Sequence, residues 1–179
     1  MKALAIYCAA KLGNESIYEQ KTRELAKYLA AEKIDIVYGG AKVGIMGVLA
    51  ETAMQNGANV YGVMPNFLVN REIANTNITQ LFVTETMSQR KYKIMELADG
   101  FIALPGGFGT LEEIFEVLTL AQVNQHNKPI GIYNINNYYS PLLQFLENCV
   151  KTGLLSQNHF DLIVVDSDHK KLIAKMRNK

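Results

Sequence analysis

The sequence of 179 residues predicts a single α/β domain: a doubly wound, Rossmann-like parallel sheet of about seven strands with helices on both faces. Short apolar runs that suit buried parallel strands alternate with segments whose apolar residues recur at helical spacing. Two glycine-rich turns each join such a run to a helical segment. No linker, repeat or low-complexity segment divides the chain, so we treat residues 1–179 as one domain.

The elements follow from these patterns in chain order. Seven apolar runs are the candidate strands: 3–8, 34–38, 59–64, 81–83, 101–104, 128–133 and 161–165. Helical spacing occupies the segments 16–31, 48–56, 87–98, 111–121 and 141–153 and a short basic segment after 168. Residues suited to helix ends flank these segments: Ser16, Thr84 or Thr86, and Ser167 or Asp168 as N-caps, Pro141 in a first turn, and Gly153 at a C-terminus.

Composition limits the classes of function. The net charge of +1 lacks the positive field with which proteins hold polynucleotides, so we expect no nucleic acid partner. The two cysteines lie far apart, which fits a reducing cytoplasm, and nowhere do about 18 apolar residues run together as a membrane span requires. None of the three histidines has metal-ligand spacing. We therefore expect a soluble cytoplasmic protein that needs no metal or cofactor and binds no membrane.

The stretch 104–113 is the most informative part of the chain. Three glycines, Gly106, Gly107 and Gly109, separate a buried strand from a helix, and glycine lets a ligand approach the main chain closely. A helix N-terminus offers unpaired N–H groups and partial positive charge, so this turn is a candidate phosphate site. Glu112 and Glu113 follow in the first turn, where they either favour the helix dipole or act on the sugar of a bound nucleotide.

A second glycine-rich turn, 39–47, follows the second strand. Its start departs from the dinucleotide pattern Gly-x-Gly-x-x-Gly because Ala41 stands at the third position, which weakens a classical NAD assignment. Such a turn serves either tight packing or a ligand, and we take Gly39 and Gly40 as ligand contacts. If the strands before the two turns are adjacent, the turns form one crevice at the carboxyl ends of the sheet.

Two pairs of charged residues have two interpretations each. Arg90 and Lys91 open the helix 87–98, either as a solvated pair or as donors to a phosphate or sugar. Arg71 and Glu72 lie in the segment 66–80, which has no clear periodicity, either as a surface ion pair or as part of a functional loop. On charge alone, solvation is the simpler interpretation of Arg90 and Lys91, and a surface ion pair is the simpler interpretation of Arg71 and Glu72.

Four ordered motifs resemble one family. The string 105–113 (PGGFGTLEE) matches the PGGxGTxxE signature of the LOG (Lonely Guy) family, the cytokinin riboside 5′-monophosphate phosphoribohydrolases. The turn 38–47 is similar to the family's YGGGxxGLMG, 87–91 to its MHxRK and 71–73 to its PREI loop. The label of possible lysine decarboxylase, which members have often carried, has no separate support in these residues.

The resemblance implies a nucleotide-binding domain that hydrolyses the N-glycosidic bond of AMP or an N6-substituted AMP, a cytokinin nucleotide, to free base and ribose 5-phosphate. It implies Glu113 and Arg90 as catalytic residues. The implied contacts to substrate and phosphate are Gly39, Gly40, Glu72, Met87, Lys91, Gly106, Gly107, Phe108, Gly109, Thr110, Leu111, Glu112 and Thr119. It also implies a homodimer or a higher homo-oligomer, with the helix after Gly47 or the one after Thr110 as the surface.

The chain departs from the family in two places. Cys8-Ala9-Ala10-Lys11 stands where CGSS is common, and Ala41 stands where a third glycine is usual. Both changes bear on the shape of the nucleotide pocket and on its preferred base. Two alternatives to the implied function are a regulatory module that binds a nucleotide without cleaving it, and a glycosylase that accepts nucleoside monophosphates more broadly.

Overall fold

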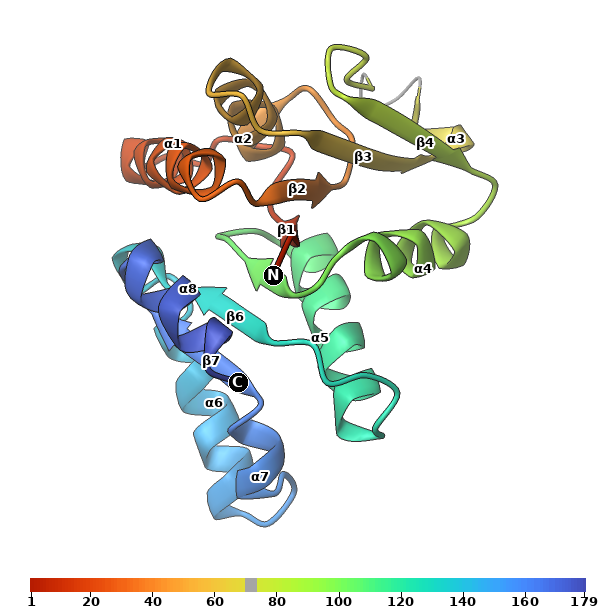
Figure 1. Ribbon diagram of the computed structural model, residues 1–179. Helices are drawn as coiled ribbons and strands as arrows, with labels where there is room; N and C mark the ends of the chain where they lie inside the picture. Colours follow the sequence, from red (N-terminus) through yellow and green to blue (C-terminus); the bar gives the residue numbers. More distant parts are fainter. Residues whose placement is uncertain (70–73) are drawn as a thin grey trace.

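The protein is a seven-stranded, all-parallel sheet in the order β4-β3-β2-β1-β5-β6-β7, shown in a computed structural model that describes residues 1–69 and 74–179 (Figure 1). The strands are β1 (Ala3–Tyr7), β2 (Asp35–Tyr38), β3 (Val60–Pro65), β4 (Gln80–Thr84), β5 (Phe101–Ala103), β6 (Ile130–Tyr133) and β7 (Ile163–Asp166). The predicted fold class and all seven predicted strands are confirmed, with ends that shift by a residue or two.

The helices also follow the predicted pattern, except that the helix predicted to follow Gly47 already begins at Gly44. They are α1 (Ser16–Ala31), α2 (Gly44–Gln55), α3 (Asn66–Val69), α4 (Met87–Leu97), α5 (Phe108–Gln122), the 3₁₀ helix η1 (Ile135–Asn137), α6 (Ser140–Lys151), α7 (Gln157–Phe160) and α8 (His169–Arg177). Thr86 and Asp168 are N-caps that accept backbone N–H bonds, as predicted. Ser16 is not an N-cap, because the helix already includes it and Glu15 precedes it. The sequence did not predict the short helices α3, η1 and α7.

Side chains alternate between two apolar cores along each central strand, because successive residues of a strand point to opposite faces. In β1, Leu4 and Ile6 pack with residues of α1, α2 and α8, whereas Ala5 and Tyr7 pack with residues of α4 and α5. Figure 1 shows α1 and α2 on one side of the sheet and α4 and α5 on the other. Both faces are therefore covered, which explains why the strands are apolar throughout.

The strand order reverses at β1 and β5, which pair with each other through Ala5–Phe101, Ile6–Ile102 and Tyr7–Ala103. From β1 the chain builds β2, β3 and β4 to one side, and from β5 it builds β6 and β7 to the other. Ligands of doubly wound folds bind beyond the carboxyl ends of the strands at such a point. The strands before the two glycine turns, β2 and β5, are not adjacent, because β1 lies between them.

Candidate active site

A cavity of about 440 Å³ lies at this reversal point. Its volume is in the range of small-molecule sites. Its wall comes from the loop after β1, the start of α2, the ends of α3 and α4, the turn into α5, and the segment after β6. The described lining residues are Cys8, Ala9, Ala10, Lys11, Leu12, Gly13, Tyr18, Ile45, Met46, Leu68, Met87, Arg90, Pro105, Gly106, Gly107, Gly109, Thr110 and Tyr138.

The N-terminus of α5 forms one wall. The helix begins after Gly107, and its N-cap makes no side-chain hydrogen bond to the first turn. A Cβ atom at Gly106 would lie 2.1 Å from Oγ1 of the buried Thr110, so this glycine is required for packing. A Cβ atom at Gly107 or Gly109 would meet nothing within 4 Å, and neither residue has a positive φ. Packing therefore explains Gly106 but not the other two glycines, and their role as contacts to a ligand stays a prediction.

Two consecutive tyrosines hold the turn before α5. The hydroxyl of Tyr139 donates to the carbonyl of Leu104 at 2.7 Å, and the hydroxyl of Tyr138 donates to the carbonyl of Gly106 at 2.8 Å. Tyr139 is buried, whereas Tyr138 is 41% exposed and lines the cavity. Sequence reasoning missed both residues, since an adjacent pair of tyrosines carries no local signal of a hydrogen bond to a turn more than 30 residues away.

Arg90 and Glu113 form a buried ion pair beside the cavity. The guanidinium of Arg90 donates through Nη1 to Oε1 of Glu113 and through Nε to the carbonyl of Val63 at 3.0 Å, and each of the two side chains is at most 10% exposed. Burial raises the pKa of Glu113, and the Arg90 guanidinium opposes that rise. Arg90 belongs to the described lining of the cavity, and Glu113 reaches the site as the ion-pair partner of Arg90, so the structure brings both predicted catalytic residues together.

Gly39 makes room for this ion pair. A Cβ atom at Gly39 would lie 2.7 Å from Nη2 of Arg90 and 2.8 Å from Sδ of Met46. Gly40 has a φ of +86° and packs against β3, where its Cβ atom would approach the backbone of Val63 at 3.4 Å. Neither glycine is among the described residues that line the cavity. The structure thus gives each a packing role, and their role as ligand contacts stays a prediction.

The N-terminus of α2 is capped by the protein itself. Ile45 N–H donates to the carbonyl of Lys11 at 3.4 Å, and Met46 N–H donates to the carbonyl of Ala9 at 3.2 Å. Gly44 has a φ of +61°, and a Cβ atom there would lie 2.2 Å from the carbonyl carbon of Ala10. The loop after β1 therefore occupies the position that a phosphate would take at α2. Of the two glycine-rich turns, the one into α5 is thus the one whose helix N-terminus is open to the cavity.

A second cluster of charges lies on the surface next to the ion pair. Nζ of Lys91 lies 2.5 Å from Oε1 of Glu112 and 3.1 Å from Oε1 of Glu116. Both contacts join α4 to α5, in which Glu112 is the fifth residue and therefore lies beyond the first turn, where the sequence had predicted it. Lys91 and Glu112 are therefore neighbours, as the predicted site requires, and their contact with a ligand stays a prediction.

The remaining predicted residues are placed as follows. Met87 begins α4 and lines the cavity. Phe108 is 94% exposed, and Leu111 packs at the margin of the core on the α4–α5 side. Thr119 lies in α5, where its hydroxyl donates to the carbonyl of Phe115 at 2.7 Å, and it does not belong to the described lining. Glu72 lies outside the described residues.

Two wider features concern metal ions and membranes. Within residues 1–69 and 74–179, no three His, Cys, Asp or Glu side chains gather so that they could hold a metal ion. In the same ranges, no helix is both long and apolar enough to cross a bilayer.

Sequence comparison identifies relatives over nearly the whole chain. A family model described as possible lysine decarboxylase matches residues 46–176. A cytokinin riboside 5′-monophosphate phosphoribohydrolase of Rhodococcoides fascians is 40% identical over 99% of this chain and 90% of its own length. An enzyme of the same name from Arabidopsis thaliana is 37% identical over 99% of this chain and 83% of its own length.

Solved structures share the fold. The Moco carrier protein of Chlamydomonas reinhardtii superposes with a TM-score of 0.71 over 98% of this chain and 95% of its own, at 19% identity. The molybdenum cofactor binding protein of Rippkaea orientalis has a TM-score of 0.69 over 98% and 94%, also at 19% identity. At identities this low, the similarity shows a shared fold and nothing about function. The matches in sequence decide the family: the chain belongs to the LOG (Lonely Guy) family, which contains the cytokinin riboside 5′-monophosphate phosphoribohydrolases.

Proposed function

We propose that this protein hydrolyses the N-glycosidic bond of adenosine-type nucleoside 5′-monophosphates, AMP or an N6-substituted AMP such as a cytokinin nucleotide. The products are the free base and ribose 5-phosphate. Relatives that are 35–40% identical and carry this activity in their names support the proposal. The observation that carries it is the buried Arg90–Glu113 pair beside a cavity that also contains the N-terminus of α5.

The reaction needs a site for phosphate and a carboxylate near the sugar. The first N–H groups of a helix have no partner within the helix, so those at Phe108, Gly109 and Thr110 are suited to bind the 5′-phosphate. The positive end of the helix dipole adds to this attraction. Because a Cβ at Gly109 would contact none of the described residues, a phosphate oxygen has room to approach the backbone there.

Glu113 supplies the carboxylate. Cleavage of a glycosidic bond develops positive charge on the sugar, which a nearby carboxylate stabilises while it orients or deprotonates the attacking water. Oε1 of Glu113 is held by Arg90, which leaves Oε2 for the sugar or the water. Arg90 orients the carboxylate and reaches the cavity itself, where it contacts the base or the phosphate.

The other predicted contacts complete the proposal. Met87, Gly106 and Gly107 lie in the cavity wall, and Lys91 with Glu112 lies beside the ion pair, so we keep these five as substrate-binding residues. Gly39, Gly40, Glu72, Leu111 and Thr119 remain weaker assignments that rest on the family resemblance.

We also propose that the enzyme is a homodimer or a higher homo-oligomer in the cytoplasm. The apolar side chains of α2 are largely buried within the subunit, so of the two helices considered, α5 is the better surface. Phe108 at its start is 94% exposed, and Tyr92 on neighbouring α4 is 70% exposed. Phe108→Glu is expected to shift the mass measured by light scattering toward the monomer. Both cysteines are free thiols, which suits a reducing compartment.

The substrate assay separates the candidate functions. The protein is incubated with AMP, isopentenyladenosine monophosphate, GMP, IMP, CMP and UMP, and the free base is measured by chromatography. Release from the two adenine nucleotides alone supports the proposal, whereas release from all six indicates the broader glycosylase. Saturable binding of AMP by calorimetry with no base released indicates the regulatory module. Free base from none of the six, across a range of pH, contradicts the enzymatic proposal.

A further inference from the structure

Lys11 is a charged residue of the cavity wall that the catalytic assignment does not use. The loop after β1 places it in the wall together with Gly106, Gly107, Gly109 and Thr110 of the turn into α5. Its backbone is fixed, because its carbonyl accepts the N–H of Ile45 at the start of α2. The side chain therefore starts from a rigid position at the cavity.

The charges around the cavity leave Lys11 as its dominant cation. In the described lining, the charged side chains are those of Lys11 and Arg90, and no carboxylate is among them. The guanidinium of Arg90 is already paired with Glu113. Lys91, the other cation near α5, is paired with two carboxylates and does not line the cavity.

The carboxylate nearest to Lys11 in sequence, that of Glu15, has other partners. Glu15 lies in the same loop as Lys11, where its Oε1 accepts the hydroxyl of Tyr18 at 3.1 Å and its Oε2 accepts Nδ2 of Asn136 at 2.7 Å. Among the described residues, no hydrogen bond or ion pair joins the ammonium of Lys11 to another group. Among the described residues, a phosphate in the cavity would thus meet the N-terminus of α5 and an ammonium without a carboxylate partner.

We propose that Lys11 is a specificity-determining residue that binds the 5′-phosphate of the substrate together with the N-terminus of α5. It selects 5′-phosphorylated nucleosides over the corresponding free nucleosides. The inference rests on the proposed function for the identity of the ligand as a nucleotide. A phosphate that is close to doubly charged at neutral pH gains from a point charge that can follow its oxygens, and lysine on a flexible stem supplies one.

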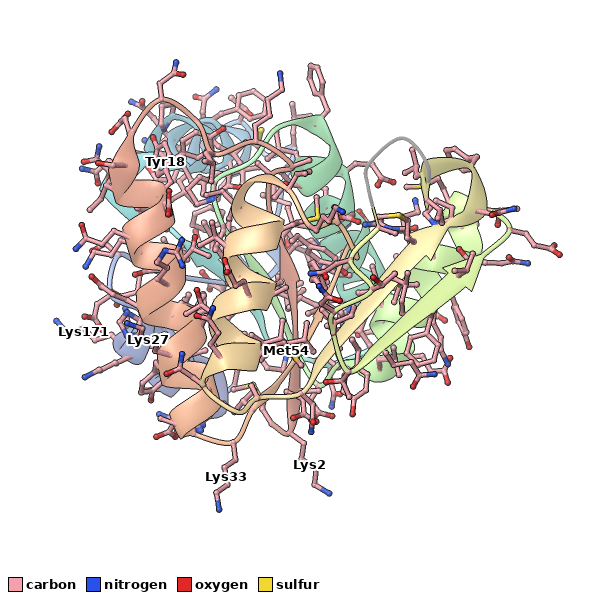
Figure 2. All side chains as sticks on the ribbon, turned by 90° about the horizontal axis from the view of Figure 1, so that it is seen from above. Lys2, Tyr18, Lys27, Lys33, Met54 and Lys171 are labelled. Atoms are coloured by element: carbon pink, nitrogen blue, oxygen red, sulfur yellow. The ribbon has the colours of Figure 1, made fainter. Side chains whose placement is uncertain are left out.

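The test uses Lys11→Met, which removes the charge and keeps most of the apolar stem. The control is Lys27→Met, which removes the same charge from an exposed position on α1, away from the Tyr18 end of that helix (Figure 2). Binding of ribose 5-phosphate is measured by calorimetry at low and moderate salt, which requires no turnover. Binding of adenosine is measured alongside, because it contains the sugar and base without phosphate.

Lys11→Met is expected to raise the Kd for ribose 5-phosphate about 10-fold, as the loss of a hydrogen bond to a charged group does. It should leave the Kd for adenosine unchanged and weaken the salt dependence of binding. Lys27→Met should match the unmodified protein. Equal affinities of Lys11→Met and the unmodified protein for ribose 5-phosphate, or no binding of this ligand by either, overturn the inference. Because the readout is binding, failure of hydrolysis contradicts the proposed function separately.

Discussion

Replacing Gly109 by alanine separates ligand binding from folding at the start of α5. Gly109 is the second residue of the helix, and a Cβ atom there would meet no atom of another described element within 4 Å. Alanine has the higher helix propensity, so the free energy of unfolding is expected to rise by roughly 0.5 kcal/mol. For a chain of this size that is an increase of about 1–2 °C in Tm.

The same methyl group would occupy the approach of a phosphate to the N–H groups of the helix. Loss of one hydrogen bond to a charged ligand costs about 1.5–3 kcal/mol, which corresponds to an increase in Kd of roughly 10- to 100-fold for ribose 5-phosphate. Thermal unfolding and calorimetry measure the two effects on one sample. Gly106→Ala is the matched variant, because its Cβ atom would lie 2.1 Å from Oγ1 of Thr110 and should lower Tm. If Gly109→Ala binds ribose 5-phosphate as tightly as the unmodified protein does, the phosphate does not bind at α5.

Three further predictions concern the turn and the ion pair. Tyr138→Phe removes the hydrogen bond to the carbonyl of Gly106 and is expected to raise the KM for AMP several-fold. Tm should change little, because Tyr138 is half-exposed. An unchanged KM would show that the turn keeps its shape without this hydrogen bond. Gly39→Ala places a Cβ atom 2.7 Å from Nη2 of Arg90 and should displace the guanidinium. Because catalysis depends on exact positioning, kcat for AMP should fall by about 10- to 100-fold. Full activity would mean that the guanidinium need not hold its position. Burial raises the pKa of Glu113, so the carboxylate takes up a proton as the pH falls through a value above the ordinary 4.5. The kcat/KM for AMP should therefore decrease as the pH falls through that raised value. If kcat/KM begins to decrease only below pH 4.5, the assignment of Glu113 is wrong.

Local patterns predicted the turn into α5 correctly, because its determinants are contiguous. A buried strand, closely spaced glycines and a helical apolar repeat follow one another within a single segment, and each has its own physical signature. Thr86 and Asp168 were predicted as caps for the same reason, since a cap acts within three residues. Ser16 failed as a cap because the helix starts one residue earlier than its side chain suggests.

The pairing of Arg90 with Glu113 required more than local pattern. On charge alone a solvated Arg-Lys pair was the simpler interpretation, and the family signature indicated otherwise. The guanidinium is buried because Gly39 leaves space for it and the carbonyl of Val63 accepts its Nε–H, and both contacts depend on how β2 and β3 lie beside α4. Long-range contacts of this kind have no signature in one sequence. The same holds for Tyr138, whose partner Gly106 is 32 residues away.

Identification of the products of AMP tests the central claim most directly. The unmodified protein and Glu113→Gln are compared at saturating AMP, and adenine, ribose 5-phosphate, adenosine and inorganic phosphate are measured together. The unmodified protein is expected to release adenine and ribose 5-phosphate in equal amounts. Glu113→Gln should bind AMP and release both products at least about 100-fold more slowly, since positioned acid–base groups contribute that much. Adenosine and inorganic phosphate in place of these products, or full activity of Glu113→Gln, would contradict the proposed hydrolysis at this site.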